Sequence, residues 1–535
     1  MLRKHFFADT HHMKTCVILF AGNLSAYACD KNFDGKSAFD LAIGWASRIE
    51  GAQKLCILAS GAVPEVLLPS LPVEVITESS WTVQKLLSAV DSFLSRGDYA
   101  TAVFSWADCP FLDDGYTKTL IELHHKYFCE YTFAEGFPYG ITPEVIDSGT
   151  VRILKNMGEK SGNTKVDRDS FFSLLKTDIN SFEIETYIPP FDLRQYRLSF
   201  HCGTKRNALL CGRMHSLKKT KNTAFDVLCR EPELLHTLPS FYALQIAKPC
   251  CSSCSYCPYP AFLRENPLLQ KQEEFMDPEK FSAVIQSISD FSDDAVISLS
   301  LWGEAMLNPH IEQFIETVLK NTKLSLVIET CSFEFTQSLL ESISSIVQKC
   351  GERTNGQKSI YWIVGIDAHS NALYNSIHND SFSLEKAVKN VEALKKYFPG
   401  SVYPQFLRLK ENEDELEGFY RFWKAHEGGE LIIQKYDSFA GTLEDKKVTD
   451  LSPVIRTPCW HLRNDIAVML DGTVPLCKSI LPHSGSTAEP WIMGNIFTDS
   501  MEKIWGSVYK HLENHCKNEY GEACRKCDEY YTFNF

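Results

Sequence analysis

Three cysteines in one short segment are spaced so that their sulfurs can share a metal cluster. Cys250, Cys254 and Cys257 form the pattern C-x3-C-x2-C. Each short spacer reaches only about 10 Å, so the thiolates can converge on a [4Fe–4S] cluster. Three protein ligands for four irons leave one iron open to a small molecule. The pattern therefore favours chemistry at that iron, whereas four cysteines would favour simple electron transfer.

A further thiol in this segment leaves the ligand set open. Cys251 with Cys254 and Cys257 gives the alternative pattern C-x2-C-x2-C, so Cys250 is preferred but not fixed. A zinc knuckle or an accidental gathering of thiols is the competing interpretation of the segment.

A second set of cysteines lies near the C-terminal end. The set comprises a widely spaced pair and a C-x2-C pair: Cys459, Cys477, Cys524 and Cys527. Four thiolates can fill every protein-ligand position of either Zn²⁺ or a fully ligated [4Fe–4S] cluster. The spacing of the cysteines alone does not distinguish zinc from a cluster. Cys516 lies close enough in sequence to substitute as a ligand, although a spare thiol is the simpler interpretation.

Alternating apolar and amphipathic segments from residue 240 onward predict the scaffold that positions the first cysteines. Strands are expected at 242–246, 296–301, 324–329, 360–366, 402–409 and 431–437. The intervening helices carry apolar stripes; one begins at Pro278 after an N-cap at Asp277, and another is expected at 413–426. Right-handed crossovers would wind these units into a six-stranded partial (β/α)6 barrel. Its chemistry would lie at the carboxyl ends of the strands, where the first cysteine loop falls.

The cysteine spacing, the aromatic Tyr256 before the last cysteine and the position after the first strand together resemble the radical S-adenosylmethionine (SAM) superfamily. In that family the open iron chelates the amino and carboxylate groups of SAM. One-electron reduction cleaves SAM to methionine and a 5′-deoxyadenosyl radical, which abstracts a substrate hydrogen. The resemblance thus implies an enzyme with a [4Fe–4S] cluster and SAM, supplied with electrons by a donor such as flavodoxin or ferredoxin.

The resemblance also places SAM contacts beside the cysteine loop and at later strand ends: Tyr256, Gly303, Glu304, Thr330, Ser332, Asp367 and Arg408. Gly303 and Glu304 match a GGE-type segment that meets the methionine amino group, with Trp302 in place of the first glycine. A glycine permits close approach of the backbone, and an acid accepts hydrogen bonds from an ammonium. The competing interpretation is an ordinary strand-end turn with solvated polar residues.

The segments CWHLRNDIAVMLDGTVPLC, GNIFTDSMEKIW and the terminal CxxC look like a SPASM-type domain, which carries auxiliary iron–sulfur clusters. The chain ends at Phe535, so the resemblance implies one auxiliary [4Fe–4S] cluster, as in shortened "twitch" variants. Such a closed cluster would accept or relay electrons. The tail is similar to that of a spirochaete-type group of radical SAM/SPASM proteins. SPASM-type relatives act on peptides, proteins or small molecules, so the resemblance implies a substrate of one of these kinds.

The amino-terminal part resembles the GT-A-like nucleotidyltransferases, in a Rossmann-like α/β domain. LFAGN, FDGKSAFDLAI and WADCPFLDD carry the resemblance, and Asp108 matches the aspartate of a D-x-P segment that binds Mg²⁺ in that family. The loop after Gly22 lacks the further glycine and arginine of active members. We therefore expect a degenerate binding or scaffold domain.

Length and composition fit a protein of several α/β domains. The 535 residues suggest four parts: 13–155 GT-A-like, 156–235 connecting, 236–445 barrel and 446–535 SPASM/twitch-like. A net charge of −14 without a basic stripe argues against a nucleic-acid partner. The sequence contains no apolar run of about 18 residues, so no membrane span is predicted. The 19 cysteines and the lack of a convincing secretory signal predict a cytoplasmic protein. Met13 is an alternative start.

Two other functions remain open from the sequence. One is a zinc-stabilised binding protein without redox chemistry. The other is an active nucleotidyltransferase with the barrel as an accessory.

Overall fold

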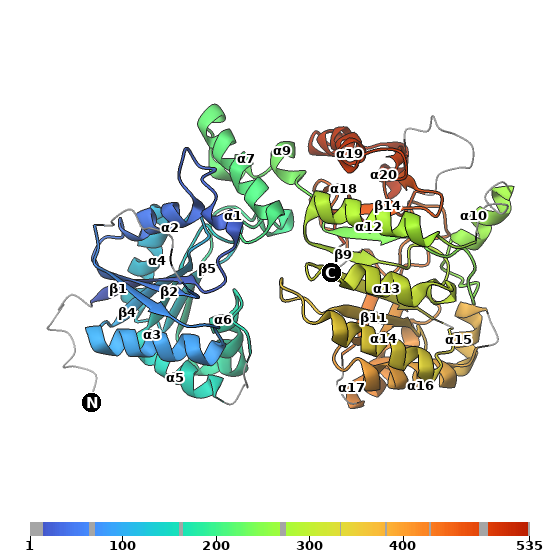
Figure 1. The fold of residues 1–535 in the computed structure, drawn as a ribbon, viewed down its shortest axis with the longest axis horizontal. Helices are drawn as coiled ribbons and strands as arrows, with labels where there is room; N and C mark the ends of the chain where they lie inside the picture. The colour runs from blue at the N-terminus through green and yellow to red at the C-terminus, as the bar shows by residue number, and fades with distance from the viewer. Residues whose placement is uncertain are drawn as a thin grey trace. The chain divides into compact units, whose positions relative to one another are not determined.

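The computed structural model describes residues 14–61, 63, 70–159, 164–267, 274–331, 333–379, 382–426, 430–480 and 491–532. The chain divides into two compact units, Met1–Leu235 and His236–Phe535. Each unit contains its own seven-stranded sheet, and the two are described separately below (Figure 1).

The first unit is built on a mixed sheet in the order β3-β2-β1-β4-β6-β5-β7. Strands β1, β2, β3 and β4 are parallel, whereas β6 runs antiparallel to both β4 and β5. All seven residues of β1 are buried, as expected for a central strand covered on both faces. The strands are β1 (Thr15–Ala21), β2 (Ala52–Ala59), β3 (Val73–Thr77), β4 (Thr101–Trp106), β5 (Tyr131–Ala134), β6 (Glu144–Asp147) and β7 (Ile184–Tyr187).

Helices with one apolar face cover this sheet. Ser37 and Asp40 form a capping box at the start of α2, and Thr82 caps α3, whose apolar stripe packs into the core. The helices are α1 (Ala26–Cys29), α2 (Ala38–Ala46), α3 (Val83–Gly97), α4 (Asp114–Tyr127), α5 (Ser148–Gly158), α6 (Ser170–Leu175), α7 (Lys205–Lys221), α8 (Phe225–Leu228) and α9 (Pro232–Leu235), with 3₁₀ turns η1 (Lys176–Ser181) and η2 (Arg194–Tyr196).

The second unit contains a curled, fully parallel sheet in the order β13-β12-β11-β10-β9-β8-β14. The strands are β8 (Phe241–Leu244), β9 (Ala295–Ser298), β10 (Leu324–Thr330), β11 (Ile360–Gly365), β12 (Val402–Arg408), β13 (Ile432–Lys435) and β14 (Asp465–Val468). The six strands expected from the sequence are present in chain order. The mixed α/β class and the half-barrel are therefore confirmed, and β14 adds a seventh strand beside β8.

The crossover helices follow one another along the outside of this sheet (Figure 1). Asp277 caps α12 as expected, and the stripe of α12 buries side chains worth roughly 1.5–3 kcal/mol each: Phe281, Val284, Ile285 and Ile288. The elements are α10 (Tyr259–Glu265), α12 (Pro278–Ser292), η3 (Ala305–Leu307), α13 (Ile311–Leu319), α14 (Gln337–Cys350), α15 (Asn371–His378), α16 (Leu384–Tyr397), η4 (Glu413–Glu415) and α17 (Leu416–Ala425).

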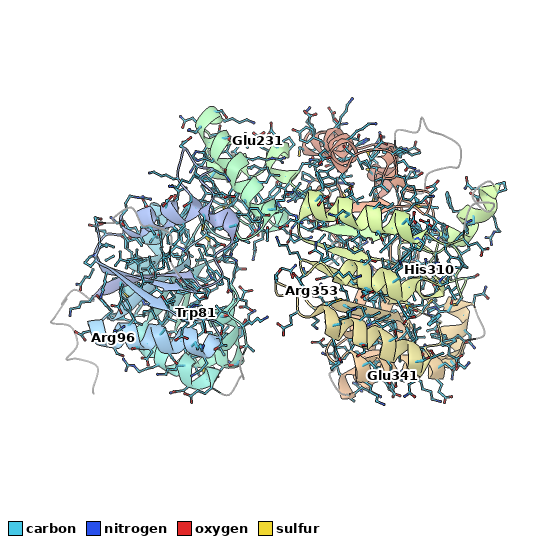
Figure 2. The ribbon with its side chains drawn as sticks, viewed as in Figure 1. Trp81, Arg96, Glu231, His310, Glu341 and Arg353 are labelled. Carbon is cyan, nitrogen blue, oxygen red and sulfur yellow. The ribbon has the colours of Figure 1, made fainter. Side chains whose placement is uncertain are left out.

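A buried arginine joins two of these crossovers. Arg353, labelled in Figure 2, follows α14 and donates hydrogen bonds to the carbonyl oxygens of Leu319, Asn321 and Leu324. Leu319 is the last residue of α13, so the bond to its carbonyl satisfies a helix-end group that has no partner within the helix.

The C-terminal part carries short elements after the barrel strands. Strands β15 (Thr473–Pro475) and β16 (Ile492–Asn495) form an antiparallel pair, accompanied by α18 (His461–Asn464), α19 (Met501–Cys516) and α20 (Glu522–Lys526). The Trp505 indole of α19 donates a 2.9 Å hydrogen bond to the Thr237 carbonyl. The helix is thus attached to the segment that leads into β8.

Two features differ from the sequence expectation. Residues 156–235 are more than a connection, because β7 pairs with β5 at the edge of the first sheet and α6 contacts α5. The helix α15 was not expected, since it follows a turn and spans only eight residues. No helix among the described residues is both long enough and apolar enough to cross a membrane.

Candidate functional site

The first cysteine loop follows β8 at the carboxyl edge of the curled sheet. Its backbone is attached to the end of α15, because Ser255 donates a 2.8 Å hydrogen bond to the Ile377 carbonyl and Ser253 donates one of 3.2 Å to that of His378. Cys257 donates to the Cys254 carbonyl at 3.1 Å, which closes the loop on itself.

A cavity of about 260 Å³ opens between this loop and the strand ends. Cys250, Cys254 and Cys257 all line it, whereas Cys251 does not. The other lining groups come from successive barrel strands and from the C-terminal part, among them Tyr256, Gly303, Glu304, Glu329, Thr330, Cys331, Gln405, Gln434, Lys435, Asp437, Lys478 and Glu529. The cysteine loop and a set of polar side chains therefore line one cavity.

Gly303 and Glu304 line this cavity, and the residue type matters at both positions. Gly303 has a φ of +75°, and a Cβ at this position would lie 2.3 Å from the Ala247 carbonyl oxygen. The strand end therefore requires glycine. The backbone N–H of Glu304 donates a 2.8 Å hydrogen bond to the Pro249 carbonyl, directly beside the first cysteine.

The Glu304 carboxyl group is buried beside polar donors. It accepts hydrogen bonds from the Thr330 hydroxyl at 3.0 Å and from the Met306 N–H at 3.2 Å, and its exposed fraction is 2%. Burial raises the pKa of Glu304 to about 8. An ammonium group placed here would offset that cost, because a buried carboxylate gains from a charged donor.

Three expected SAM contacts need separate description. Asp367 is fully buried and does not line the cavity; its Oδ1 accepts from the Leu407 N–H at 2.7 Å, and its Oδ2 accepts from the Tyr256 hydroxyl at 3.0 Å. Arg408 also lies outside the cavity lining and pairs with Glu413 through Nε at 3.0 Å. Ser332 lies outside the described residues.

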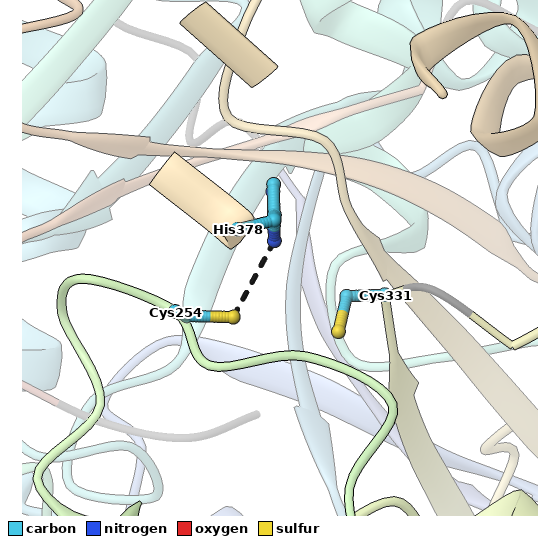
Figure 3. Close-up of side chains that lie close together, drawn as sticks. All are labelled: Cys254, Cys331 and His378. Carbon is cyan, nitrogen blue, oxygen red and sulfur yellow. Dashed lines mark hydrogen bonds between the residues drawn. The ribbon is translucent and has the colours of Figure 1, made fainter. Parts of the chain in front are cut away.

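Cys331 and His378 are two site residues that the sequence analysis did not select. Among the described residues, Cys254, Cys331 and His378 form the one group of possible metal ligands whose donor atoms all lie within 4.8 Å of one another (Figure 3). Cys331 directly follows Thr330 at the end of β10, and that position was the available signal. His378 ends α15, whose sequence gave no indication of proximity to Cys254.

The four C-terminal cysteines also surround one space. Cys459, Cys477, Cys524 and Cys527 line a common small cavity with apolar and aromatic neighbours. Their sulfurs are not gathered within 4.8 Å, whereas tetrahedral zinc with Zn–S bonds of about 2.3 Å would hold them about 3.8 Å apart. Burial raises the pKa of Cys477 to about 12, and a bound metal replaces that proton. The four thiols thus face one space in which a metal group could be held.

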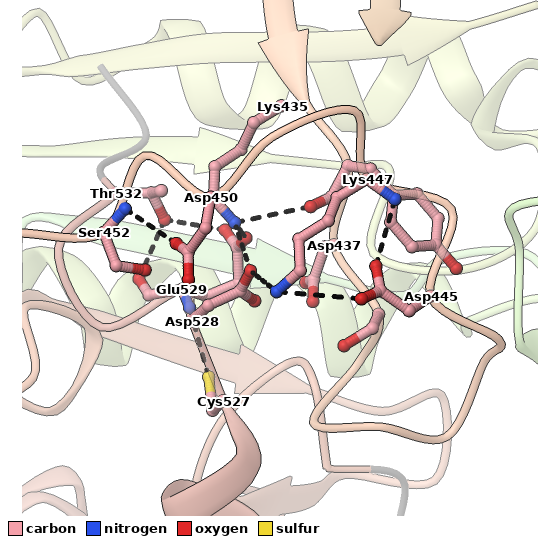
Figure 4. Close-up of polar contacts among 12 residues, drawn as sticks. Lys435, Asp437, Asp445, Lys447, Asp450, Ser452, Cys527, Asp528, Glu529 and Thr532 are labelled. Carbon is pink, nitrogen blue, oxygen red and sulfur yellow. Dashed lines mark hydrogen bonds and ion pairs between the residues drawn. The ribbon is translucent and has the colours of Figure 1, made fainter. Parts of the chain in front are cut away.

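A charged network joins the tail after Cys527 to the barrel (Figure 4). Lys435, the last residue of β13, forms ion pairs with Glu529 and, at 3.4 Å, with Asp528. The Glu529 N–H donates a 3.3 Å hydrogen bond to the sulfur of Cys527. Because Lys435 and Glu529 both line the large cavity, this network connects that cavity to the second cysteine set.

In the first unit, Asp108 is engaged by another side chain. Arg168 donates hydrogen bonds to both carboxylate oxygens, at 2.6 and 3.2 Å. Its guanidinium lies over the rings of Trp106 and Tyr139. Burial alone would raise the pKa of Asp108, but the charges of Arg168 and His201 hold it below its ordinary value. The carboxylate that resembles a magnesium ligand is thus held by an internal cation.

Comparisons with known proteins agree with this site. Two family models match the chain: "Radical SAM superfamily" over residues 245–422, and the SPASM "Iron-sulfur cluster-binding domain" over residues 459–528. An uncharacterized protein of Treponema pallidum is 36% identical over 371 residues, covering 68% of this chain and 98% of that protein.

Two solved structures illustrate the more distant likenesses. One is anSMEcpe with bound AdoMet, at 14% identity and a TM-score of 0.38, covering 55% of this chain and 84% of that one. The other is a cytidylyltransferase from Leptospira borgpetersenii, at 14% identity and a TM-score of 0.32, covering 41% of this chain and 92% of that one. At such scores neither carries an argument about this protein.

The chain belongs to the radical SAM superfamily and carries a SPASM domain. A [4Fe–4S] cluster and SAM are therefore its cofactors, and the SPASM domain brings auxiliary iron–sulfur binding. The expected cofactors and enzyme class are confirmed at this level.

Proposed function

We propose that this enzyme cleaves SAM reductively at a cluster held by Cys250, Cys254 and Cys257, and that the 5′-deoxyadenosyl radical abstracts hydrogen from a substrate in the adjoining cavity. The observation that carries the proposal is the shared cavity, because the three cysteines, Gly303 and Glu304 all line it. The cofactor supplies the radical when bound, and the protein supplies its orientation.

The lining favours Cys250 over Cys251 as the third ligand. Cys250 faces the cavity together with Cys254 and Cys257, and Cys251 is absent from its lining. Glu304 and Thr330 are proposed to receive the methionine amino end of SAM, because their hydrogen-bonded pair places a carboxyl group beside the loop. Tyr256 is proposed to line the SAM site from the cysteine loop.

Asp367 and Arg408 are proposed to act indirectly. The Asp367 carboxylate accepts hydrogen bonds from the Tyr256 hydroxyl and the Leu407 N–H, and Arg408 is paired with Glu413. These contacts support roles in holding the strand ends that surround SAM. Direct contact with SAM is assigned to the residues that line the cavity.

The polar lining of the cavity supports a polar substrate. Barrel strands contribute the carboxylate of Glu329 and the amides of Gln405 and Gln434, and the C-terminal part contributes Lys478. Polar groups that converge on an enclosed space fix the orientation of a ligand. We propose a small polar molecule or a polar side chain of a peptide or protein as the substrate.

The auxiliary cluster is proposed to accept or relay an electron. Glu529 lines the substrate cavity and lies two residues after Cys527, which we assign as a ligand of that cluster with Cys459, Cys477 and Cys524. A flavodoxin or ferredoxin is proposed as the external donor. We place this chemistry in the cytoplasm, where thiolate ligands remain reduced.

Deuterium transfer tests hydrogen abstraction. Reconstituted, reduced protein is incubated with SAM and fractions of a deuterium-labelled cell extract, and 5′-deoxyadenosine is analysed by mass spectrometry. The proposal expects deuterium in 5′-deoxyadenosine with a fraction that contains the substrate. If every fraction supports SAM cleavage without deuterium transfer, hydrogen abstraction from a substrate is contradicted.

A further inference from the structure

The thiol of Cys331 lies among the cysteines of the first motif although it comes from a different strand. Cys331 follows β10, and its sulfur lies within 4.8 Å of both the Cys254 sulfur and a ring nitrogen of His378 (Figure 3). Cys331 lines the same cavity as Cys250, Cys254 and Cys257. Four thiols from two strand ends therefore face one space.

The Cys331 sulfur lies among sulfur-containing and polar side chains. Besides the Cys254 sulfur and the His378 ring, it faces the cavity that Cys250 and Cys257 also line. The sulfur also lies 3.6 Å from the Ser252 hydroxyl. Thiolate is the form of cysteine that binds iron.

His378 is held in place from its other side. Its Nε2 faces the Ile366 carbonyl at 3.3 Å and the Asp367 carboxylate at 3.4 Å, and both are acceptors, so Nε2 carries a proton. Its Nδ1 lies 3.4 Å from the Cys254 sulfur. The imidazole is therefore fixed beside the thiols by a buried carboxylate, as is common for groups next to metal ligands.

We propose that Cys331 is a displaceable fourth protein ligand of the first cluster, binding the fourth iron when SAM is absent. This inference rests on the proposed assignment of Cys250, Cys254 and Cys257 to the other three irons. Its basis is the position of the Cys331 sulfur within 4.8 Å of the Cys254 sulfur, on the cavity that Cys250 also lines and that must also admit SAM.

Exchange of the ligand involves no oxidation or reduction. The bond between the Cys331 sulfur and iron breaks, and bonds from the amino nitrogen and a carboxylate oxygen of SAM form. The proton that the ammonium of SAM releases is accepted by the departing thiolate. Cys331 would thus protect the cluster from loss of its fourth iron until SAM arrives.

The test compares the full-length reconstituted protein with Cys331→Ala, without SAM. Each sample is oxidised mildly with ferricyanide, and the EPR signal of a [3Fe–4S] cluster is quantified. Cys251→Ala is the matched control, because it removes a neighbouring thiol that does not line the cavity. We expect a strong [3Fe–4S] signal from Cys331→Ala only, with Cys251→Ala behaving as the unchanged protein.

A second measurement uses the affinity for SAM, determined by equilibrium dialysis under anaerobic conditions. If Cys331 occupies the iron about nine-tenths of the time, removing it tightens SAM binding about tenfold. Cys331→Ser is measured in parallel, so that poor folding of the alanine variant does not decide the result. The serine variant is expected to bind SAM more tightly than the unchanged protein.

Equal [3Fe–4S] yields from the unchanged protein and Cys331→Ala, or unchanged SAM affinity in both variants, would overturn the inference. Zinc bound by Cys254, Cys331 and His378 in protein that lacks the first cluster would also overturn it. Failure of the proposed function would give a different result. The protein would resist iron loss as expected, yet it would release no 5′-deoxyadenosine after reduction.

Discussion

The Tyr256 hydroxyl donates a 3.0 Å hydrogen bond to the Asp367 carboxylate, which joins the cysteine loop to the end of β11. The other oxygen of Asp367 accepts from the Leu407 N–H in β12 at 2.7 Å. One buried carboxylate therefore connects the loop after β8 with two strands on the other side of the barrel. The backbone of Asp367 has a φ of +59°, which lies in the left-handed region, where aspartate is tolerated better than most residues.

Replacing Tyr256 with phenylalanine removes one donor from this connection. The buried Asp367 oxygen then loses a hydrogen bond, and we expect a loss of about 1–3 kcal/mol of stability in the second unit. Urea unfolding of the full chain measures the change, and iron content reports whether the loop still holds its cluster. Tyr420→Phe, at an exposed position, is the control. Equal transition midpoints for both variants would argue against a supporting role for Tyr256.

Glu304→Gln tests recognition of the ammonium group of SAM. Hydrogen bonds to charged groups contribute about 1.5–3 kcal/mol, so we expect SAM affinity to fall roughly 10- to 150-fold while iron content stays the same. Anaerobic equilibrium dialysis measures the affinity. Glu329→Gln is the matched control, because Glu329 lines the same cavity from β10 and is assigned to the substrate end. A larger loss in the control than in Glu304→Gln would reverse the two assignments.

Removing cysteines from one set at a time should distinguish the iron contents of the two clusters. Reconstituted protein is expected to contain about eight irons if both sites hold [4Fe–4S] clusters. Cys254→Ala should retain about four and release no 5′-deoxyadenosine, whereas Cys459→Ala combined with Cys477→Ala should lose the other four. Iron analysis and EPR of the reduced samples measure the contents. Zinc in place of iron at the second set would contradict the auxiliary cluster.

Asp108→Asn tests whether the carboxylate in the first unit is structural. It would break a buried pair with Arg168, and such losses cost about 3–5 kcal/mol. We expect the first unit to unfold at lower urea concentration while SAM cleavage is retained. The control is Asp192→Asn, which disturbs an exposed arginine pair. Pyrophosphate release from a nucleoside triphosphate and a sugar phosphate that disappears in Asp108→Asn would instead indicate a nucleotidyltransferase.

The regular part of the fold followed from local patterns in the sequence. The apolar stripe of α12 with its cap at Asp277 predicted a crossover helix, and the apolar segment 324–329 predicted the strand β10. The cysteine loop was located because its ligands lie within eight residues of one another. Such signals lie within short stretches of the sequence, so they can be recognised without knowledge of the tertiary structure.

The contacts that complete the site are long-range and had no local signal. Cys254 and His378 are 124 residues apart in the chain, and they meet because α15 ends beside the cysteine loop. Asp367 lies at a strand end as expected, but its backbone conformation turns the carboxylate toward Tyr256 and away from the cavity. The pairing of β14 with β8 likewise depends on the folded chain, because 220 residues separate the end of β8 from the start of β14.

Reductive cleavage of SAM tests the central claim most directly. Anaerobically reconstituted protein is reduced with dithionite in the presence of SAM, and the products are separated by chromatography. We predict 5′-deoxyadenosine and methionine in equal amounts, with none from Cys254→Ala. Protein that retains its iron and binds SAM but releases no 5′-deoxyadenosine after reduction would contradict the assignment of a SAM-cleaving cluster to Cys250, Cys254 and Cys257.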